Sequence, residues 1–219
     1  MKKINWKKFG GQFIEDEIDY IKNYLDYKNQ FGNPFKPSDV KISIGCDSKA
    51  RRKSITYAIT IVFYSDIEHN GAHVIFKRFR VPKHVVYSGK KMNQWDGSYE
   101  DNSAKKKLDH MKEGDMSAIF NRLYNEADYL LELGQEVDKA LKNIYWQKHS
   151  ANDYDDSLPY RLPELHLDLN PEAFKAGKHN KSNTVYNAVI GMLTGYGFKV
   201  VAKPEAYASS SCADLLSNK

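Results

Sequence analysis

Residues 40–81 read VKISIGCDSKARRKSITYAITIVFYSDIEHNGAHVIFKRFRV, and this stretch decides the fold class. It holds three runs rich in β-branched and aromatic residues, VKISIGCDS, ITYAITIVFYS and GAHVIFKRFRV. The polar segments SKARRK and DIEHNG separate them. Such runs between polar turns are typical of strands, and short turns join antiparallel neighbours. The stretch therefore predicts a three-stranded antiparallel meander.

Helices and strands alternate after this meander. Apolar residues recur at helical spacing from residue 116 to about 146, and LHLDLN (165–170) then predicts a short fourth strand. NTVYNAVIGMLTGYG predicts a helix ended by glycine, FKVVAKP a fifth strand, and PEAYASSSCADLLS a last helix. The fourth and fifth strands follow helices and can pair in parallel. We therefore expect an α/β fold with a mixed five-stranded sheet and helices on both faces.

The domain organisation follows from what flanks these elements. The 219 residues contain no Gly/Ser-rich or Pro-rich linker, which predicts one domain with additions. IEDEIDYIKNYLDYKN (14–29) predicts an amphipathic helix outside the core sheet. Residues 1–39 are thus interpreted as an N-terminal helical extension and 40–219 as the main domain. Residues 82–115, which are polar and punctuated by glycine, are interpreted as an insertion.

Composition limits the compartment and the partners. The two cysteines lack metal or disulfide spacing, the first residues lack an apolar signal run, and no apolar stretch approaches the length of a membrane span. We expect a soluble cytoplasmic protein without a membrane partner. The net charge of +5 is weak evidence by itself. Basic clusters at 49–53 and 175–181 follow two acidic positions, where they favour phosphate binding over the alternative of solvated turns.

Asp47 and Asp214 are the first two candidate acids. Asp47 closes an apolar run beside Gly45 and Ser48, although an aspartate in such a position often only caps a turn. Asp214 lies in ASSSCADLL, a tract of small residues whose backbone can pack tightly against a neighbour. A solvated position on the helix face is the alternative for Asp214.

Glu126 and Asp168 are the other two candidates. On a helical wheel Glu126 falls inside the apolar stripe of the 116–146 helix, where an unpaired carboxylate is unfavourable, whereas Glu132 and Glu136 fall outside it. In LHLDLN the period of two places His166 and Asp168 on one face of the strand. His166 is more typical of a hydrogen-bonded histidine than of a ligand, because the chain has no histidine pair at zinc spacing. Oxygen ligands favour Mg²⁺ or Mn²⁺.

The motifs GCDSK, RLYNE, HLDLN, GKHNKSNT and GYGFKVVAKPEAYASSSCAD together resemble the ribonuclease H-like YkuK family, in order and over roughly residues 40–216. The resemblance implies a ribonuclease H-like fold. It also implies metal-binding acids on the first strand, the first helix, the end of the fourth strand and the last helix. These positions correspond to Asp47, Glu126, Asp168 and Asp214.

These observations lead to a functional hypothesis. We expect a nuclease in which Asp47 bridges two Mg²⁺ or Mn²⁺ ions, the other three acids complete their shells, and DNA, RNA or a hybrid is cleaved. Phosphate contacts are assigned to Ser48, Lys178, Lys181 and Lys203, and surface solubility is the alternative for the three lysines. A non-catalytic nucleic-acid-binding or scaffolding module is the second hypothesis, and a dimeric junction resolvase is the third. The sequence leaves the oligomeric state open.

Overall fold

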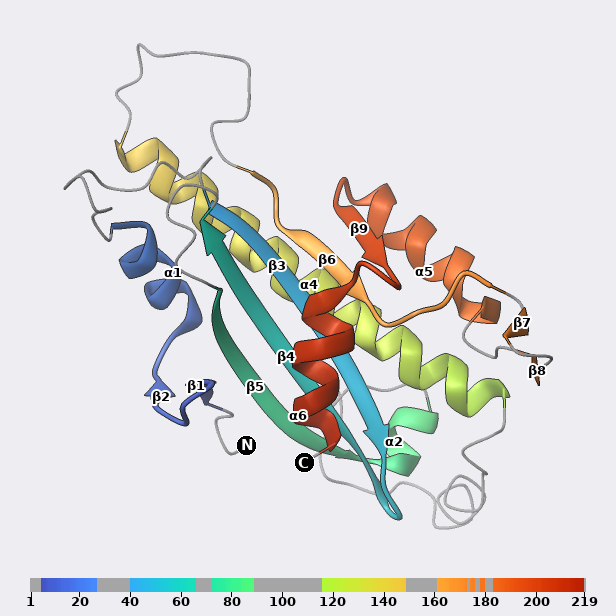
Figure 1. Ribbon diagram of the computed structural model, residues 1–219. Helices are drawn as coiled ribbons and strands as arrows, with labels where there is room; N and C mark the ends of the chain where they lie inside the picture. The colour runs from blue at the N-terminus through green and yellow to red at the C-terminus, as the bar shows by residue number, and fades with distance from the viewer. Residues whose placement is uncertain are drawn as a thin grey trace.

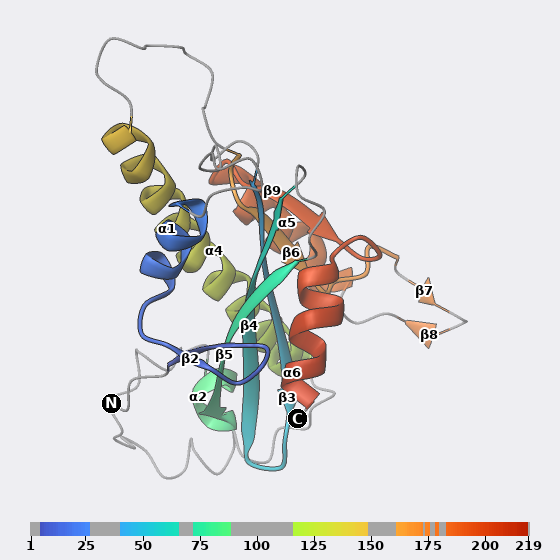
Figure 2. The ribbon, with the colours of Figure 1, turned by 60° about the vertical axis from the view of Figure 1, so that its left-hand side comes forward.

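A computed structural model describes residues 5–26, 40–65, 72–88, 116–148, 161–172, 174–175, 178–179 and 183–218. Its centre is a twisted mixed sheet (Figure 1). The long helix α4 (Met116–Lys148) covers one face of the sheet, and the C-terminal helical segment covers the other (Figure 2). The α/β fold with helices on both faces is confirmed.

The five expected strands are all present and pair as predicted. β3 (Val40–Ala50), β4 (Ser54–Ser65) and β5 (His73–Pro82) form the antiparallel meander. β6 (Glu164–Leu167) runs parallel to β3 on its other side, and β9 (Lys199–Ala202) runs parallel to β6. The helices between these strands explain why the last two could join in parallel.

The number of strands differs from the prediction, because the sheet has seven strands in the order β2-β1-β5-β4-β3-β6-β9. The two additional strands, β1 (Trp6–Lys8) and β2 (Phe13–Ile14), extend the sheet beyond β5. Strands this short give no alternation that a sequence pattern could reveal. The N-terminal extension therefore contributes strands to the sheet as well as the expected helix, α1 (Glu17–Asp26).

The segments between the core elements are described only in part. α2 (Lys83–Tyr87) follows β5, and residues 89–115 of the proposed 82–115 insertion lie outside the described residues. The basic cluster of residues 175–181 follows β6. It overlaps a two-stranded hairpin, β7 (Phe174–Lys175) with β8 (Lys178–His179).

The apolar stripe predicted for the long helix is confirmed on α4. Its members are all buried: Ile119, Leu123, Leu130, Leu133, Val137, Leu141 and Ile144. Glu126 is buried among them, while Glu132 and Glu136 are exposed. The second expected helix is α5 (Asn183–Gly195), and Gly197 follows it with the positive φ of 87° that glycine favours at a helix end.

The last helix begins as a π-helix, η3 (Ala208–Ala213), and continues as α6 (Asp214–Asn218). Its small residues allow the backbone to lie directly on the sheet at Gly45. A Cβ atom added to Gly45 would be 2.2 Å from the carbonyl carbon of Ala208. Thr60 on the next strand donates its hydroxyl to the Ala208 carbonyl at 2.8 Å. The tight backbone packing expected for this tract is therefore confirmed.

Substitution of Gly45 by alanine should test this contact. We expect Gly45→Ala to lower the free energy of unfolding by about 3 kcal/mol or more, at the upper end of the cost of overpacking a core, because a backbone segment must move. Urea titration measures the change. Gly191→Ala on α5 is the control, since a Cβ there meets nothing within 4 Å and should stabilise the helix by about 0.5–1 kcal/mol. Similar shifts of the midpoint in both variants would contradict the contact.

Candidate functional site

Asp47 lies within a strand and does not cap a turn. β3 continues three residues beyond it to Ala50, and Asp47 is paired with Ala58 of β4. The neighbouring strand β6 ends at Leu167, opposite Cys46. Asp47 is thus the first residue of β3 that no longer pairs with β6.

Asp47 is 9% exposed, and its environment comes from the last helix. The Ser217 hydroxyl donates a hydrogen bond to its Oδ2 atom at 2.5 Å. Burial raises the pKa of Asp47, the Ser217 hydrogen bond opposes this effect, and the negative charge of Asp214 adds to it. Asp47 is therefore a buried acid held beside a second carboxylate.

Asp214 begins α6 and is half-buried rather than fully solvated. Its Oδ1 atom accepts a hydrogen bond from the Asn218 side chain at 2.7 Å. Arg51 closes the other end of the helix by donating to the carbonyl oxygens of Ser217 and Asn218 at 2.9 and 2.8 Å. These contacts fix the short helix, and with it Asp214, near Asp47.

Glu126 approaches from α4 on the opposite face of the sheet and is 1% exposed. The Ser48 hydroxyl donates to its Oε1 atom, and Arg122 donates to the Ser48 carbonyl at 2.8 Å. Burial raises the pKa of Glu126 to about 8, and the charge of Asp47 contributes to the rise. Because that pKa lies above neutrality, the Glu126 carboxyl is mostly protonated at pH 7 in this arrangement.

Alternation along β3 explains how acids from both faces meet at one strand. Successive side chains point to opposite faces, so Asp47 contacts Ser217 of α6 while Ser48 contacts Glu126 of α4. Ser48 was predicted to contact substrate, but here it is buried and orients Glu126. The candidate site therefore spans the sheet around residues 47 and 48.

Asp168 follows β6 and is paired with a cation. The Lys203 ammonium lies 2.5 Å from its Oδ1 atom, which is buried and accepts no hydrogen bond of good geometry. Lys203, predicted to contact phosphate, thus neutralises Asp168 in this structure. Lys178 lies in β8, and its side chain and the whole of Lys181 fall outside the described residues.

The negative charge of Asp214 raises the pKa of Asp47, and the negative charge of Asp47 raises the pKa of Glu126, so Asp47 is coupled to one predicted acid on each face of the sheet. Asp168 remains with Lys203. In the part of the chain that the structure describes, no three histidine, cysteine, aspartate or glutamate side chains are grouped so that they could hold a metal ion.

Two residues of the site were not singled out from the sequence. Arg122 lies one helical turn before Glu126, and this spacing of four residues between a cation and a buried acid was a readable signal. Ser217 gave no comparable signal, because its contact with Asp47 joins residues 170 positions apart.

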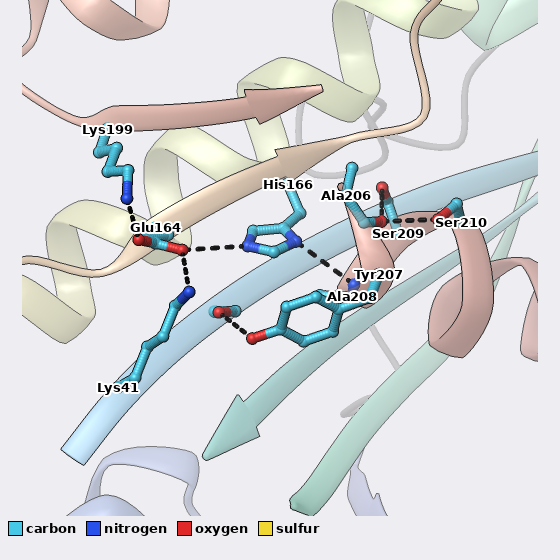
Figure 3. Close-up of polar contacts among 10 residues, drawn as sticks. Lys41, Glu164, His166, Lys199, Ala206, Tyr207, Ala208, Ser209 and Ser210 are labelled. Carbon is cyan, nitrogen blue, oxygen red and sulfur yellow. Dashed lines mark hydrogen bonds and ion pairs between the residues drawn. The ribbon is translucent and has the colours of Figure 1, made fainter. Parts of the chain in front are cut away.

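A second polar cluster, around Glu164, anchors the start of the last helix (Figure 3). Lys199 and Lys41 contact the Glu164 carboxylate at 2.6 and 2.8 Å. Burial would raise the pKa of Glu164, but the two lysines lower it to about 2. His166 accepts a hydrogen bond from the Ala208 amide at 3.4 Å, and burial lowers its pKa to about 4. The expectation of a hydrogen-bonded His166 is therefore confirmed.

Comparison with known proteins assigns the chain to a family. A family model described as Ribonuclease H-like matches residues 100–218, which is more than half of the chain. The protein belongs to this ribonuclease H-like family, as its motifs suggested, and the membership indicates a function connected with nucleic acid. No curated protein and no solved structure is significantly similar to the chain.

The matched segment includes Glu126, Asp168 and Asp214 but begins after Asp47. The three-stranded meander and the N-terminal strands therefore lie outside it. Within the described residues, no helix is both long and apolar enough to cross a membrane.

Proposed function

We propose that this protein is a divalent-metal-dependent nuclease that hydrolyses phosphodiester bonds in DNA, RNA or a hybrid. The observation that carries the proposal is the buried Asp47. It lies on β3 just past the end of β6, and its pKa and that of Glu126 are raised by neighbouring acids, Asp214 and Asp47 respectively. Membership in the ribonuclease H-like family supports the choice of nucleic acid as substrate. Buried acids whose pKa values are raised by desolvation and by a neighbouring charge are typical of functional sites.

The proposed cofactors are two Mg²⁺ or Mn²⁺ ions, held by Asp47, Glu126, Asp168 and Asp214. The donor set fits hard cations because every donor is a carboxylate oxygen. The raised pKa values of Asp47 and Glu126 support the same choice, since a bound cation would offset the cost of their buried charges. Bound ions of this kind supply an activated water and stabilise the charge on the leaving oxygen.

The chain's own residues prepare the site in defined ways. Ser48 and Arg122 hold Glu126 in a fixed orientation, and Ser217 does the same for Asp47. Asp168 would join the other acids when its ion pair with Lys203 opens, which would also free the Lys203 ammonium for a phosphate. Phosphate contacts by Lys178 and Lys181 remain part of the proposal.

Cleavage of a labelled substrate panel tests this function. The panel contains single-stranded and duplex DNA and RNA, a hybrid duplex and a four-way junction, each incubated with Mg²⁺, Mn²⁺ or EDTA. We expect cleavage of at least one substrate with Mg²⁺ or Mn²⁺ and none with EDTA. Cleavage of the junction alone by a dimer would instead indicate a resolvase.

A non-catalytic nucleic-acid-binding module is the second candidate function. The ion pair between Lys203 and Asp168 favours it, because an acid neutralised by a lysine need not bind a metal. Binding of nucleic acid that is equally strong with and without EDTA, together with no cleavage under any condition, would support this second function over the nuclease.

A further inference from the structure

We propose that the groove between the N-terminal hairpin and the end of α6 binds single-stranded nucleic acid. This inference rests on the proposed function in its choice of polymer, and it adds the strandedness and the path of the ligand. The groove has a volume of about 450 Å³. The residues that carry the argument are Lys7, Phe9, Phe76, Arg78, Arg80 and Leu216.

Strand register places the cations of this groove on the face of the sheet that carries Asp47. Arg78 of β5 is paired with Ala58 of β4, which is paired with Asp47 of β3. Residues paired across a sheet point to the same face. Arg80 lies two residues further along β5, and Lys7 of β1 is paired with Phe76 of β5. In Figure 1 the β1–β2 hairpin and α6 flank β5 on its two sides.

The cations of the groove are not paired with any acid of the described residues. Among the described residues, no carboxylate forms an ion pair with Lys7, Arg78 or Arg80. Burial lowers the pKa of Arg78, and the positive charges of Arg80 and Arg51 lower it further. Several cations gathered without counter-charges form a site for an anion, and a row of such sites suits the phosphates of a polynucleotide.

Aromatic side chains accompany these cations. Phe9 is 46% exposed, and its ring lies edge-on to Phe76 with 6.0 Å between the ring centroids. Phe13 is 64% exposed, and the Lys7 ammonium lies 4.5 Å from its ring centroid. Exposed rings beside cations are the components with which proteins bind single strands, because each base can stack on a ring while the phosphates meet the charges. In a duplex the base faces are already stacked, so we favour a single strand.

The groove leads towards the candidate site. Leu216 lines it and packs with Ala58 and Ala213, and the next residue, Ser217, contacts Asp47. Two strand spacings separate β5 from β3, which is about 10 Å. A strand held in the groove would therefore lie within a few nucleotides of Asp47. All of the named groove residues except Leu216 precede residue 100 and lie outside the segment that the family model matches.

Fluorescence anisotropy with a labelled 12-nucleotide oligo-dT or oligo-U in EDTA tests the groove separately from cleavage. Arg78→Gln/Arg80→Gln should weaken binding at least about 10-fold and reduce the slope of log K against log salt by about 1.4, or 0.7 for each lost phosphate contact. Phe9→Ala should weaken binding by about 5-fold or more while leaving this slope unchanged. A duplex of the same length should bind more weakly than the single strand.

The control is Lys22→Gln/Lys142→Gln, which removes two charges from exposed lysines of α1 and α4 outside the groove. We expect it to bind oligonucleotide as the wild type does. Equal weakening by both double variants would overturn the groove, as would a tighter complex with the duplex. Loss of binding in the groove variants without any cleavage by the wild type would refute the nuclease and retain the groove. Cleavage by the wild type together with unaltered binding in the groove variants would refute the groove and retain the nuclease.

Discussion

Asp47→Asn should reduce cleavage by more than about 100-fold while leaving the fold intact. A loss of 10- to 100-fold is typical when a residue that only orients a metal ligand is removed, and we propose a more direct role for Asp47. The fold should persist because the asparagine carbonyl can still accept the Ser217 hydrogen bond. Since burial already raises the pKa of Asp47, a neutral side chain suits the position. Single-turnover cleavage with Mg²⁺ and a thermal melt together check both parts.

Asp138→Asn is the matched control for this substitution. Asp138 lies on α4 and pairs with Lys142 one turn later, a surface contact away from β3. We expect its cleavage rate to equal that of the wild type. A purified Asp47→Asn protein that melts normally and cleaves at the wild-type rate would exclude Asp47 from the chemistry. The nuclease proposal would then lose the observation that carries it.

The core of the fold could be predicted from sequence because its signals are local. The three strands of residues 40–81 and the long helix after residue 116 carry regular apolar patterns, and the structure reproduces them. β1 and β2 could not be predicted in this way. They contain three and two residues, and they exist because β5 offers an edge with which to pair. The π-helical start of the last helix lies against Gly45, a contact between residues too distant in sequence to be read from a local pattern.

The sequence predicted those site residues whose burial can be read from an apolar pattern. Glu126 was distinguishable from Glu132 because a helical wheel places it in the apolar stripe, and the structure buries it there. The partners of the acids were beyond sequence reasoning, since contacts such as Ser217 with Asp47 link distant parts of the chain. The ion pair between Asp168 and Lys203 is a similar case, because both residues were assigned to the site but not to each other.

Glu126→Gln is expected to abolish cleavage and yet stabilise the metal-free protein, increasingly as the pH rises. The pKa of Glu126 is about 8 in the folded protein, above the ordinary 4.5 of an unfolded chain. A carboxyl group whose pKa is raised by folding contributes stability that is fully present below the unfolded value. That stability is lost as the pH rises through the folded value. The loss should therefore develop between about pH 4.5 and 8 and amount to a few kcal/mol at pH 7, at 1.36 kcal/mol for each unit of pKa shift.

Glutamine is close in shape to the protonated glutamate, can accept the Ser48 hydrogen bond, and does not ionise. In urea titrations in EDTA at pH 5, 6, 7 and 8, the free energy of unfolding of the variant should therefore rise relative to that of the wild type at each step. Glu132→Gln, at an exposed position of the same helix, should follow the wild-type profile throughout. Mn²⁺ should reduce the difference in unfolding free energy between the variant and the wild type. A bound cation favours the ionised Glu126 of the wild type and cannot do so for glutamine. A variant that is less stable than the wild type at pH 8 would mean that Glu126 is ionised and paired in the folded protein. A difference that does not change with pH would mean that its burial has no effect on its proton.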